Sequence, residues 1–163
     1  MTDSDALPLR IRALQPGEAL RLYPVFHSAV HRLAARHYTP AQCAAWAPLP
    51  FDEAAWVQRI ERNHPCVALV RGVIAGFADL QPDGTIDQFF VDAAHAGQGV
   101  GSALLAFLLG QAKAQGLRQV RSHVSLTAQP LFMRHGFAVV QRQTVQLRGM
   151  AFENAVMACE LRP

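Results

Sequence analysis

The sequence predicts an α+β domain, an α/β sandwich in which helices flank a mixed central sheet of about seven strands. Three observations lead to this prediction: apolar residues recur at helical spacing in the first third, short β-rich segments separated by tight turns follow, and a glycine-rich loop opens a long helix later in the chain. A length of 163 residues fits one domain, so residues 1–163 are expected to form a single unit.

The first third is predicted to be mostly helical. Proline and glycine punctuate it, Thr39 and Asp52 are suitable N-caps, and Pro40 suits a first helical turn. The expected elements are a strand over Leu9–Leu14, a helix from Glu18 to about Arg36, a short helix beginning at Thr39-Pro40 and a helix from Asp52 to about Asn63.

The rest of the chain is predicted to alternate strands with two helices. Turn signals stand at Arg71-Gly72, at Pro82-Asp83-Gly84 and at Gly149. The expected strands are Cys66–Val70, Val73–Leu80, Thr85–Val91, Gln119–Val124, Phe137–Arg148 and Ala151–Leu161, and the expected helices are Gly101 to about Gln115 and Ala128–His135.

Composition and charge exclude several classes of protein. The chain is 51% hydrophobic and 17% charged, which argues against disorder, and its fifteen Lys and Arg form no dense run, which argues against nucleic-acid binding. The longest apolar run, near Leu104–Leu109, is too short to span a bilayer. The start MTDSDALPLR does not resemble a signal peptide, so the expected location is the cytoplasm.

The three cysteines indicate neither a disulfide framework nor a zinc site. Cys43, Cys66 and Cys159 are scattered and odd in number, and none belongs to a CxxC pair. We expect them to be buried as small hydrophobic residues, and we expect no metal.

The loop Ala96–Ser102 is the strongest functional signal. It carries glycines at 97, 99 and 101 directly before a predicted helix. Glycine permits tight turns and close approach to a ligand, and the first amides of a helix have no internal partner, so the loop suits a pyrophosphate. A Rossmann turn would need a first strand before it and an acid about 20 residues later, and a Walker loop would need a lysine; neither requirement is met.

The stretch VDAAHAGQGVGSALL resembles the acyl-CoA signature of the GNAT N-acetyltransferases, in which Gln/Arg-x-x-Gly-x-Gly/Ala opens a helix. Gly99 and Gly101 match this signature, whereas Ala96 stands at the Gln/Arg position. QPLFMRHGF is similar to the late helix of the family and its turn into the sixth strand. The segments HYTPAQCAAWAP, IDQFFV, RHGF and RQTVQLRG resemble a YafP-like subgroup of small bacterial acetyltransferases.

This resemblance implies direct transfer of an acetyl group from acetyl-CoA to an amine, without a metal. It also implies that the fourth and fifth strands splay apart and that the pantetheine arm of the cofactor lies between them. The cofactor-binding residues that it implies are Phe89, Phe90, Val91, Ala96, Gly97, Gln98, Gly99, Val100, Gly101, Ser102, Ser125 and Phe132.

Asp87 and His123 are the catalytic candidates, because the acceptor amine must lose a proton before it attacks. Asp87 is an acid in an otherwise apolar strand, where burial would shift its pKa toward neutrality and strand alternation would put it on one face with Phe89 and Val91. His123 can serve instead, because imidazole titrates near neutral pH. Many family members use a tyrosine where this chain has Phe132, so Tyr38 or His135 would protonate the thiolate, or no acid is needed.

The acceptor is expected to meet the early helices and the final hairpin. The proposed contacts are Tyr38 and Trp46, which flank a proline-started turn, with Arg148 and Asn154 from the hairpin. Polyamines, aminoglycosides, amino acids, aromatic amines and protein N-termini remain open as acceptors. The competing function is a CoA-binding module or sensor without transferase activity. The resemblance also allows a homodimer through the final hairpin.

Overall fold

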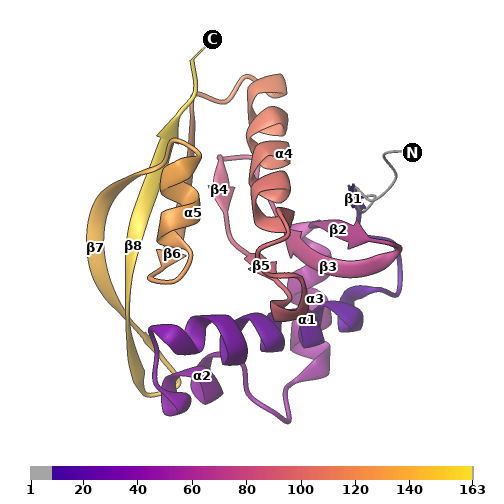
Figure 1. Cartoon of the computed structure of the whole chain (residues 1–163), viewed down its shortest axis with the longest axis vertical. Helices are drawn as coiled ribbons and strands as arrows, with labels where there is room; N and C mark the ends of the chain where they lie inside the picture. Colours follow the sequence, from indigo (N-terminus) through magenta and orange to yellow (C-terminus); the bar gives the residue numbers. More distant parts are fainter. Residues whose placement is uncertain (1–8, 163) are drawn as a thin grey trace, which may run out of the picture.

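Two four-stranded sheets form the centre of the computed structural model, which describes residues 9–162 (Figure 1). The amino-terminal segment, in which no signal peptide was expected, lies largely outside the described residues. The strands of sheet A are β1 Leu9–Ala13, β2 Cys66–Val70, β3 Val73–Ala78 and β5 Phe89–Val91, in the order β1-β2-β3-β5. All of their pairings are antiparallel.

Sheet B holds the carboxy-terminal strands. Its strands are β4 Thr85–Ile86, β6 Gln119–Ser125, β7 Ala138–Leu147 and β8 Met150–Glu160, in the order β4-β6-β8-β7. β4 pairs with β6 in parallel, and the other pairings are antiparallel. The prediction of both parallel and antiparallel strand pairing is therefore confirmed, but the strands are divided differently from the prediction. The strand predicted over Thr85–Val91 is two strands that belong to different sheets.

The interruption between β4 and β5 falls at Asp87 and Gln88. Their backbone amides donate to the carboxylate of Asp79, at 2.8 and 3.0 Å, instead of entering a ladder. Before this point the chain pairs with β6, and after it the chain pairs with β3. A buried side chain thus replaces two ladder hydrogen bonds, which allows the two sheets to diverge here.

The predicted helix over residues 18–36 is present but irregular. It consists of a 3₁₀ turn Ala19–Arg21, helix α1 Leu22–Ser28, a π-helical segment Ala29–Leu33 and a 3₁₀ turn Ala34–Arg36. Pro24 lies in the first turn of α1, where a missing N–H costs little and where its ring disfavours a regular helix before it. The apolar face of this segment packs against Trp56, Ile60 and Phe77.

The two expected helix caps are confirmed. Thr39 and Gln42 form a capping box at α2 Pro40–Trp46, and Asp52 Oδ1 accepts the amide of Ala55 at α3 Glu53–Asn63. Both hairpin turns also occur as expected, because Arg71-Gly72 and Arg148-Gly149 take positive φ at both residues. The three cysteines are free and buried.

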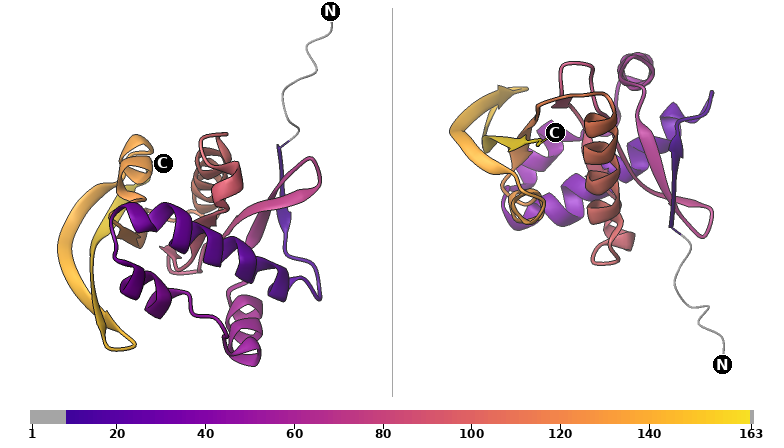
Figure 2. Two further views of the ribbon diagram at one scale, coloured as in Figure 1. Left: turned by 60° about the horizontal axis from the view of Figure 1, so that its bottom comes forward. Right: turned by 90° about the horizontal axis from the view of Figure 1, so that it is seen from above.

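Helix α4 Val100–Ala114 lies between the two sheets, with α5 Gln129–Arg134 beside it (Figure 1). Both views of Figure 2 show the β7–β8 hairpin on one flank of α4 and the strands β2 and β3 on the other. Gly76 in β3 allows α4 to approach closely, because a Cβ there would lie 2.9 Å from the Phe90 carbonyl oxygen and 3.1 Å from Leu104. None of the described helices is long and apolar enough to cross a membrane.

Candidate active site

A cleft of about 540 Å³ opens where the two sheets diverge. Its walls come from α1, α2 and its following loop, α3, the segment 87–90, β6, α5 and the end of β7. Its polar lining consists of Asp52, Arg59, Asp87, Gln88, Ser122, His123, Gln146 and Arg148, and its aromatic lining of Tyr23, Phe26, Trp46, Phe51, Trp56, Phe89, Phe90 and Phe132.

Two unpaired strand edges face each other across this divergence. β5 is the edge strand of sheet A, and among the described strands it pairs only with β3. β6 loses its parallel partner after Ser122, since β4 ends at Ile86. Among the described residues, the backbone groups of Phe89, Val91 and His123 that face this gap therefore have free hydrogen-bonding capacity, which suits an extended ligand that carries amides.

The glycine-rich loop lies at the start of α4, as predicted. Gly97 and Gly99 have φ of 75° and 82°, and Gly99 is the N-cap of this 15-residue helix. Among residues 9–162, no acceptor is recorded for the backbone amides from Gly97 to Ser102. Free amides at the positive end of a helix form an anion site, and residues 96–99 are exposed to solvent.

The three glycines of the loop have different physical roles. A Cβ at Gly97 or Gly99 would meet nothing within 4 Å, so positive φ is what these positions require. A Cβ at Gly101 would lie 2.8 Å from Leu131 Cδ2, and it would also touch Val91 and Phe89. Gly101 therefore permits α5 and β5 to pack closely against the first turn of α4.

The loop is anchored to the end of α1 through Ser28. The Ser28 hydroxyl donates to Asp92 Oδ1 at 2.9 Å and accepts the Ala93 amide at 3.1 Å. The same Asp92 oxygen accepts the Ala94 amide at 2.9 Å. These bonds hold the 3₁₀ turn Ala93–His95 that leads from β5 into the loop.

Asp87 lines the cleft, but the expectation that it would be buried is wrong. Its side chain is 41% exposed, and its Oδ2 accepts Arg59 Nη2 at 3.1 Å and Asn63 Nδ2 at 2.7 Å. The expected alternation also fails. Asp87 turns to α3, whereas Phe89 and Val91 pack toward α4 and α5, because the strand is interrupted between them.

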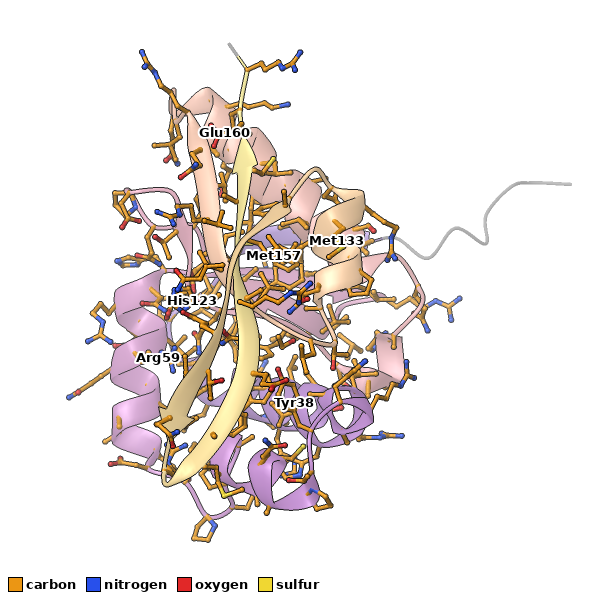
Figure 3. The ribbon with its side chains drawn as sticks, turned by 90° about the vertical axis from the view of Figure 1, so that its left-hand side faces the viewer. Tyr38, Arg59, His123, Met133, Met157 and Glu160 are labelled. Carbon is orange, nitrogen blue, oxygen red and sulfur yellow. The ribbon has the colours of Figure 1, made fainter. Side chains whose placement is uncertain are left out.

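His123 also lines the cleft, from the exposed face of β6. Its Nδ1 lies 3.3 Å from Gln143 Nε2 on β7. In the view of Figure 3, His123 and Arg59 lie on one side of the β7–β8 ribbon and Tyr38 lies on the other. The two catalytic candidates thus share one cleft, and each keeps polar atoms that neighbouring side chains do not occupy.

Among the predicted cofactor residues, Phe89, Phe90 and Phe132 line the cleft. Phe132 is 1% exposed and packs edge-on against Phe89, with ring centroids 5.2 Å apart. Phe90 turns to the opposite side, where it packs against Phe26 and Phe77. The Ser125 hydroxyl accepts the Ala128 amide at 3.3 Å, as a turn hydroxyl does.

Two of the predicted acceptor residues do not lie in the wall of the cleft. Tyr38 is 6% exposed; its hydroxyl donates to the Glu153 carbonyl and accepts the Leu126 amide at 3.1 Å. Burial raises the pKa of Tyr38. Tyr38 thus connects three elements and is not placed to protonate a thiolate there. Asn154 lies on β8 away from the cleft, with a buried Oδ1 that has no partner among the described residues.

The other two predicted acceptor residues do line the cleft. Trp46 packs edge-on against Phe90, with centroids 6.1 Å apart. Arg148 Nη1 donates to the Ala45 carbonyl at 2.6 Å, which joins the tip of the final hairpin to α2. His135, the other acid candidate, lies at the end of α5 and does not line the cleft.

Asp79 and Gln88 are the residues that sequence reasoning missed. Asp79 is 1% exposed and also accepts Asn63 Nδ2 at 3.2 Å and Gln81 Nε2 at 3.1 Å. Burial raises the pKa of its carboxyl, and the amide of Asp87 acts in the opposite direction. Gln88 is 2% exposed, and its Oε1 has no hydrogen-bond partner among the described residues. Two features of the sequence could have drawn attention to them: Asp79 stands at the end of an apolar strand, and Gln88 lies among apolar residues in IDQFFV.

Known proteins resemble this chain over most of its length. The family model described as Acetyltransferase (GNAT) domain matches residues 34–159. A protein of Escherichia coli (strain K12), Uncharacterized N-acetyltransferase YafP, is 36% identical over 149 residues, which cover 91% of this chain and 94% of that protein.

Solved structures are similar to this chain as well. A crystal structure from Rhodopseudomonas palustris, described as GCN5-Related N-acetyltransferase: Aminotransferase, Class-II, has a TM-score of 0.88 at 30% identity and covers 93% of this chain and 95% of its own. The yncA protein of Salmonella typhimurium, described as a putative acetyltransferase with its cofactor acetyl-CoA, shares the fold with a TM-score of 0.68 at 21% identity, over 94% of each chain.

Proposed function

Because this chain belongs to the GNAT acetyltransferase family and is an acyl-CoA-dependent N-acetyltransferase, we propose that it transfers the acetyl group of acetyl-CoA directly to a primary amine bound in the cleft beside Asp87. The observation that carries this proposal is the continuity of three features: the free amides of residues 97–102, the facing strand edges of β5 and β6, and the polar cleft next to them.

The diphosphate of CoA is assigned to the start of α4. A helix N-terminus with unpaired amides binds phosphate without help from a side chain. The Gln/Arg side chain that relatives place at position 96 is therefore dispensable here, although Ala96 removes one donor. The surrounding loop residues are exposed, so the phosphates can reach the amides without displacing the core.

The pantetheine arm is assigned to the gap between β5 and β6. Its amides would pair with backbone groups at Phe89 and Val91, as an added strand pairs with a sheet edge. Phe132 would supply an apolar surface beside the arm, since it already packs on Phe89. A backbone amide at this edge would polarise the thioester carbonyl as negative charge develops on its oxygen.

Asp87 is proposed as the general base. Its Oδ2 is held by Asn63 and Arg59, whereas its Oδ1 has no partner among the described residues. This free oxygen can accept a proton from a protonated acceptor amine, directly or through a water molecule. His123 on the opposite wall is the alternative base, since its exposed imidazole reaches the same cleft.

No general acid is assigned for the departing thiolate. Phe132 stands where many relatives have tyrosine, and Tyr38 and His135 do not line the cleft. A thiol with a pKa near that of free cysteine, about 8.5, leaves as a thiolate without protonation. The same substitution is the observation that favours the second candidate function, a CoA-binding module without transferase activity.

Two measurements on separate variants test the proposal. We expect Asp87→Asn to lower kcat/KM for an amine by roughly 100-fold or more, the usual effect of losing a general base, with the Kd for CoA unchanged by calorimetry. His123→Gln is the matched variant from the opposite wall. If kcat/KM falls in His123→Gln and not in Asp87→Asn, the general base is His123 and not Asp87. CoA binding without turnover of any amine by the wild-type protein would favour the module.

A further inference from the structure

The cleft beside the glycine-rich loop carries balanced charge rather than an excess of one sign. Its carboxylates are Asp52 and Asp87, and its guanidinium groups are Arg59 and Arg148. A polyamine or an aminoglycoside carries several positive charges and is best matched by an excess of carboxylates. This lining matches an acceptor that carries both a positive and a negative group.

Arg59 and Asp87 present the two opposite charges side by side. Arg59 Nη2 lies 3.1 Å from Asp87 Oδ2. Among the described residues, this is the one hydrogen bond of the Arg59 guanidinium, so its remaining N–H groups are available to a ligand. Asp87 Oδ1 is equally unpaired, and both side chains are nearly half exposed toward the cleft.

The pair is held in position from α3. Asn63 is 8% exposed, and its Nδ2 donates both to Asp87 Oδ2 at 2.7 Å and to Asp79 Oδ2 at 3.2 Å. Asp79 in turn holds the backbone amide of Asp87 at 2.8 Å. The carboxylate of Asp87 is thus fixed relative to α3, which also carries Arg59.

We propose that the acceptor is an α-amino acid, whose carboxylate binds the free N–H groups of Arg59 while its amine lies at Asp87 Oδ1. This inference rests on the proposed function and names the substrate class of the same site. In an α-amino acid the amine and the carboxylate are attached to one carbon and are therefore close together. This spacing suits a site in which the carboxylate of Asp87 and the guanidinium of Arg59 are already in contact. Planar guanidinium groups recognise carboxylates in a paired geometry.

The remaining lining indicates an apolar side chain on that amino acid. Tyr23 stacks on Phe51 with ring centroids 3.5 Å apart, and Trp56 meets Tyr23 edge-on at 4.9 Å. These rings line the same cleft as Arg59. Burial of an apolar side chain against these rings is favourable, and the rings carry no carboxylate that would pair with a basic side chain.

The experiment compares an α-amino acid with amines that lack its carboxylate. Phenylalanine, phenylalaninamide, 2-phenylethylamine and spermidine are assayed at fixed acetyl-CoA with the wild-type protein, with Arg59→Gln and with the control Arg62→Gln. Arg62 is an exposed arginine of α3 that does not line the cleft. We expect wild type to prefer phenylalanine over the amide and the amine by about 10-fold or more in kcat/KM, equivalent to about 1.4 kcal/mol.

The variants separate the role of Arg59 from a general loss of activity. Arg59→Gln should lower kcat/KM for phenylalanine about 10-fold more than it lowers kcat/KM for 2-phenylethylamine, because the contact of Arg59 with Asp87 Oδ2 is lost for both acceptors alike, whereas Arg62→Gln should change neither value. Equal rates with and without the carboxylate in wild type, or equal losses for both acceptors in Arg59→Gln, would overturn the inference and leave the transferase proposal intact. Turnover of no amine at all, with CoA still bound, would overturn both.

Discussion

Asp79 and Gln88 bind each other through both backbone and side chain. The Asp79 amide donates to the Gln88 carbonyl at 3.1 Å, and the Gln88 amide donates to Asp79 Oδ2 at 3.0 Å. The first bond continues the pairing of β3 with the strand that becomes β5, and the second takes the place of a ladder partner. One buried carboxylate therefore marks the point at which the two sheets separate.

Replacing Asp79 with Asn should destabilise the protein by about 1–3 kcal/mol. Both carboxylate oxygens accept hydrogen bonds, and Asn would place an NH₂ group against donors on one side. Urea unfolding measures the loss, and Glu61→Gln, an exposed change on α3, is the control. An unchanged midpoint for Asp79→Asn would show that the separation of the sheets does not depend on this carboxylate.

The cost of this substitution should depend on pH in a defined direction. Burial raises the pKa of Asp79 above its ordinary value of 3.8, so the folded protein holds the proton to higher pH than the unfolded chain does. The contribution of this group to stability is full below about 3.8 and declines as the pH rises toward the raised pKa. The difference in unfolding free energy between wild type and Asp79→Asn should narrow as the pH rises from 3.8 through the raised pKa.

Gly99→Ala should weaken CoA binding, whereas Gly116→Ala should not. Both glycines have positive φ, 82° and 74°, and neither has an atom within 4 Å of a built Cβ. Each alanine should therefore cost about 1 kcal/mol or slightly more of stability. Only Gly99 lies among the free amides before α4, so only its variant should raise the Kd for CoA in calorimetry. A similar Kd for both variants would argue against a diphosphate at this loop.

Gly76→Ala and Gly110→Ala should change stability in opposite directions. A Cβ at Gly76 would lie 2.9 Å from the Phe90 carbonyl, which is backbone and cannot move aside without disturbing β5. Overpacking of this kind costs about 1–3 kcal/mol. Gly110 lies in α4 with open space around it, so alanine there should add up to about 1 kcal/mol. Thermal unfolding of the two variants checks both signs.

Glu18→Gln should cost about 1 kcal/mol at neutral pH. Arg12 donates to both Glu18 oxygens, at 2.9 and 3.1 Å, and the Gln15 amide adds a third bond. The hydrogen bond from Arg12 lowers the pKa of Glu18 below 4.5, so its stabilisation is present above pH 4.5 and is lost as the pH falls through the lowered value. A double-mutant cycle with Arg12→Met isolates the pair; a coupling energy of zero at pH 7 would contradict this account.

Tyr38→Phe should lower stability without altering acceptor binding. The change removes the donor to the Glu153 carbonyl and leaves the half-buried Leu126 amide without its acceptor, at a cost of about 1–3 kcal/mol. Because Tyr38 does not line the cleft, the KM for the acceptor should stay as in wild type below the melting temperature. A KM for the acceptor that rises 10-fold or more in the folded variant would show that Tyr38 contacts the acceptor.

Local features were predictable from the sequence because their causes lie within a few residues. Thr39 with Gln42, and Asp52 with the Ala55 amide, act within one helical turn. Gly97 and Gly99 occupy left-handed conformations that their own lack of a Cβ allows. The loop before α4, the turns at Arg71-Gly72 and at Gly149 and the burial of the cysteines were all predicted on this basis.

The placement of Asp87, Tyr38 and Asn154 could not be predicted in the same way. Asp87 was expected to follow strand alternation, but Asp79, eight residues earlier, interrupts the strand and turns Asp87 toward Arg59 and Asn63. The hydroxyl of Tyr38 forms hydrogen bonds with the backbone of Leu126 and Glu153, which are 88 and 115 residues away in the sequence. No periodicity within a window of the sequence carries information about such partners.

The sequence by itself determined most of the elements, their order and the place of the glycine-rich loop before α4, because propensity, capping and glycine conformations act over short distances along the chain. Tertiary structure decided where the sheets separate, which carboxylate is buried and which is exposed, and which side chains share the cleft. Those outcomes depend on hydrogen bonds and packing between segments far apart in sequence, and only folding brings their atoms within reach of one another.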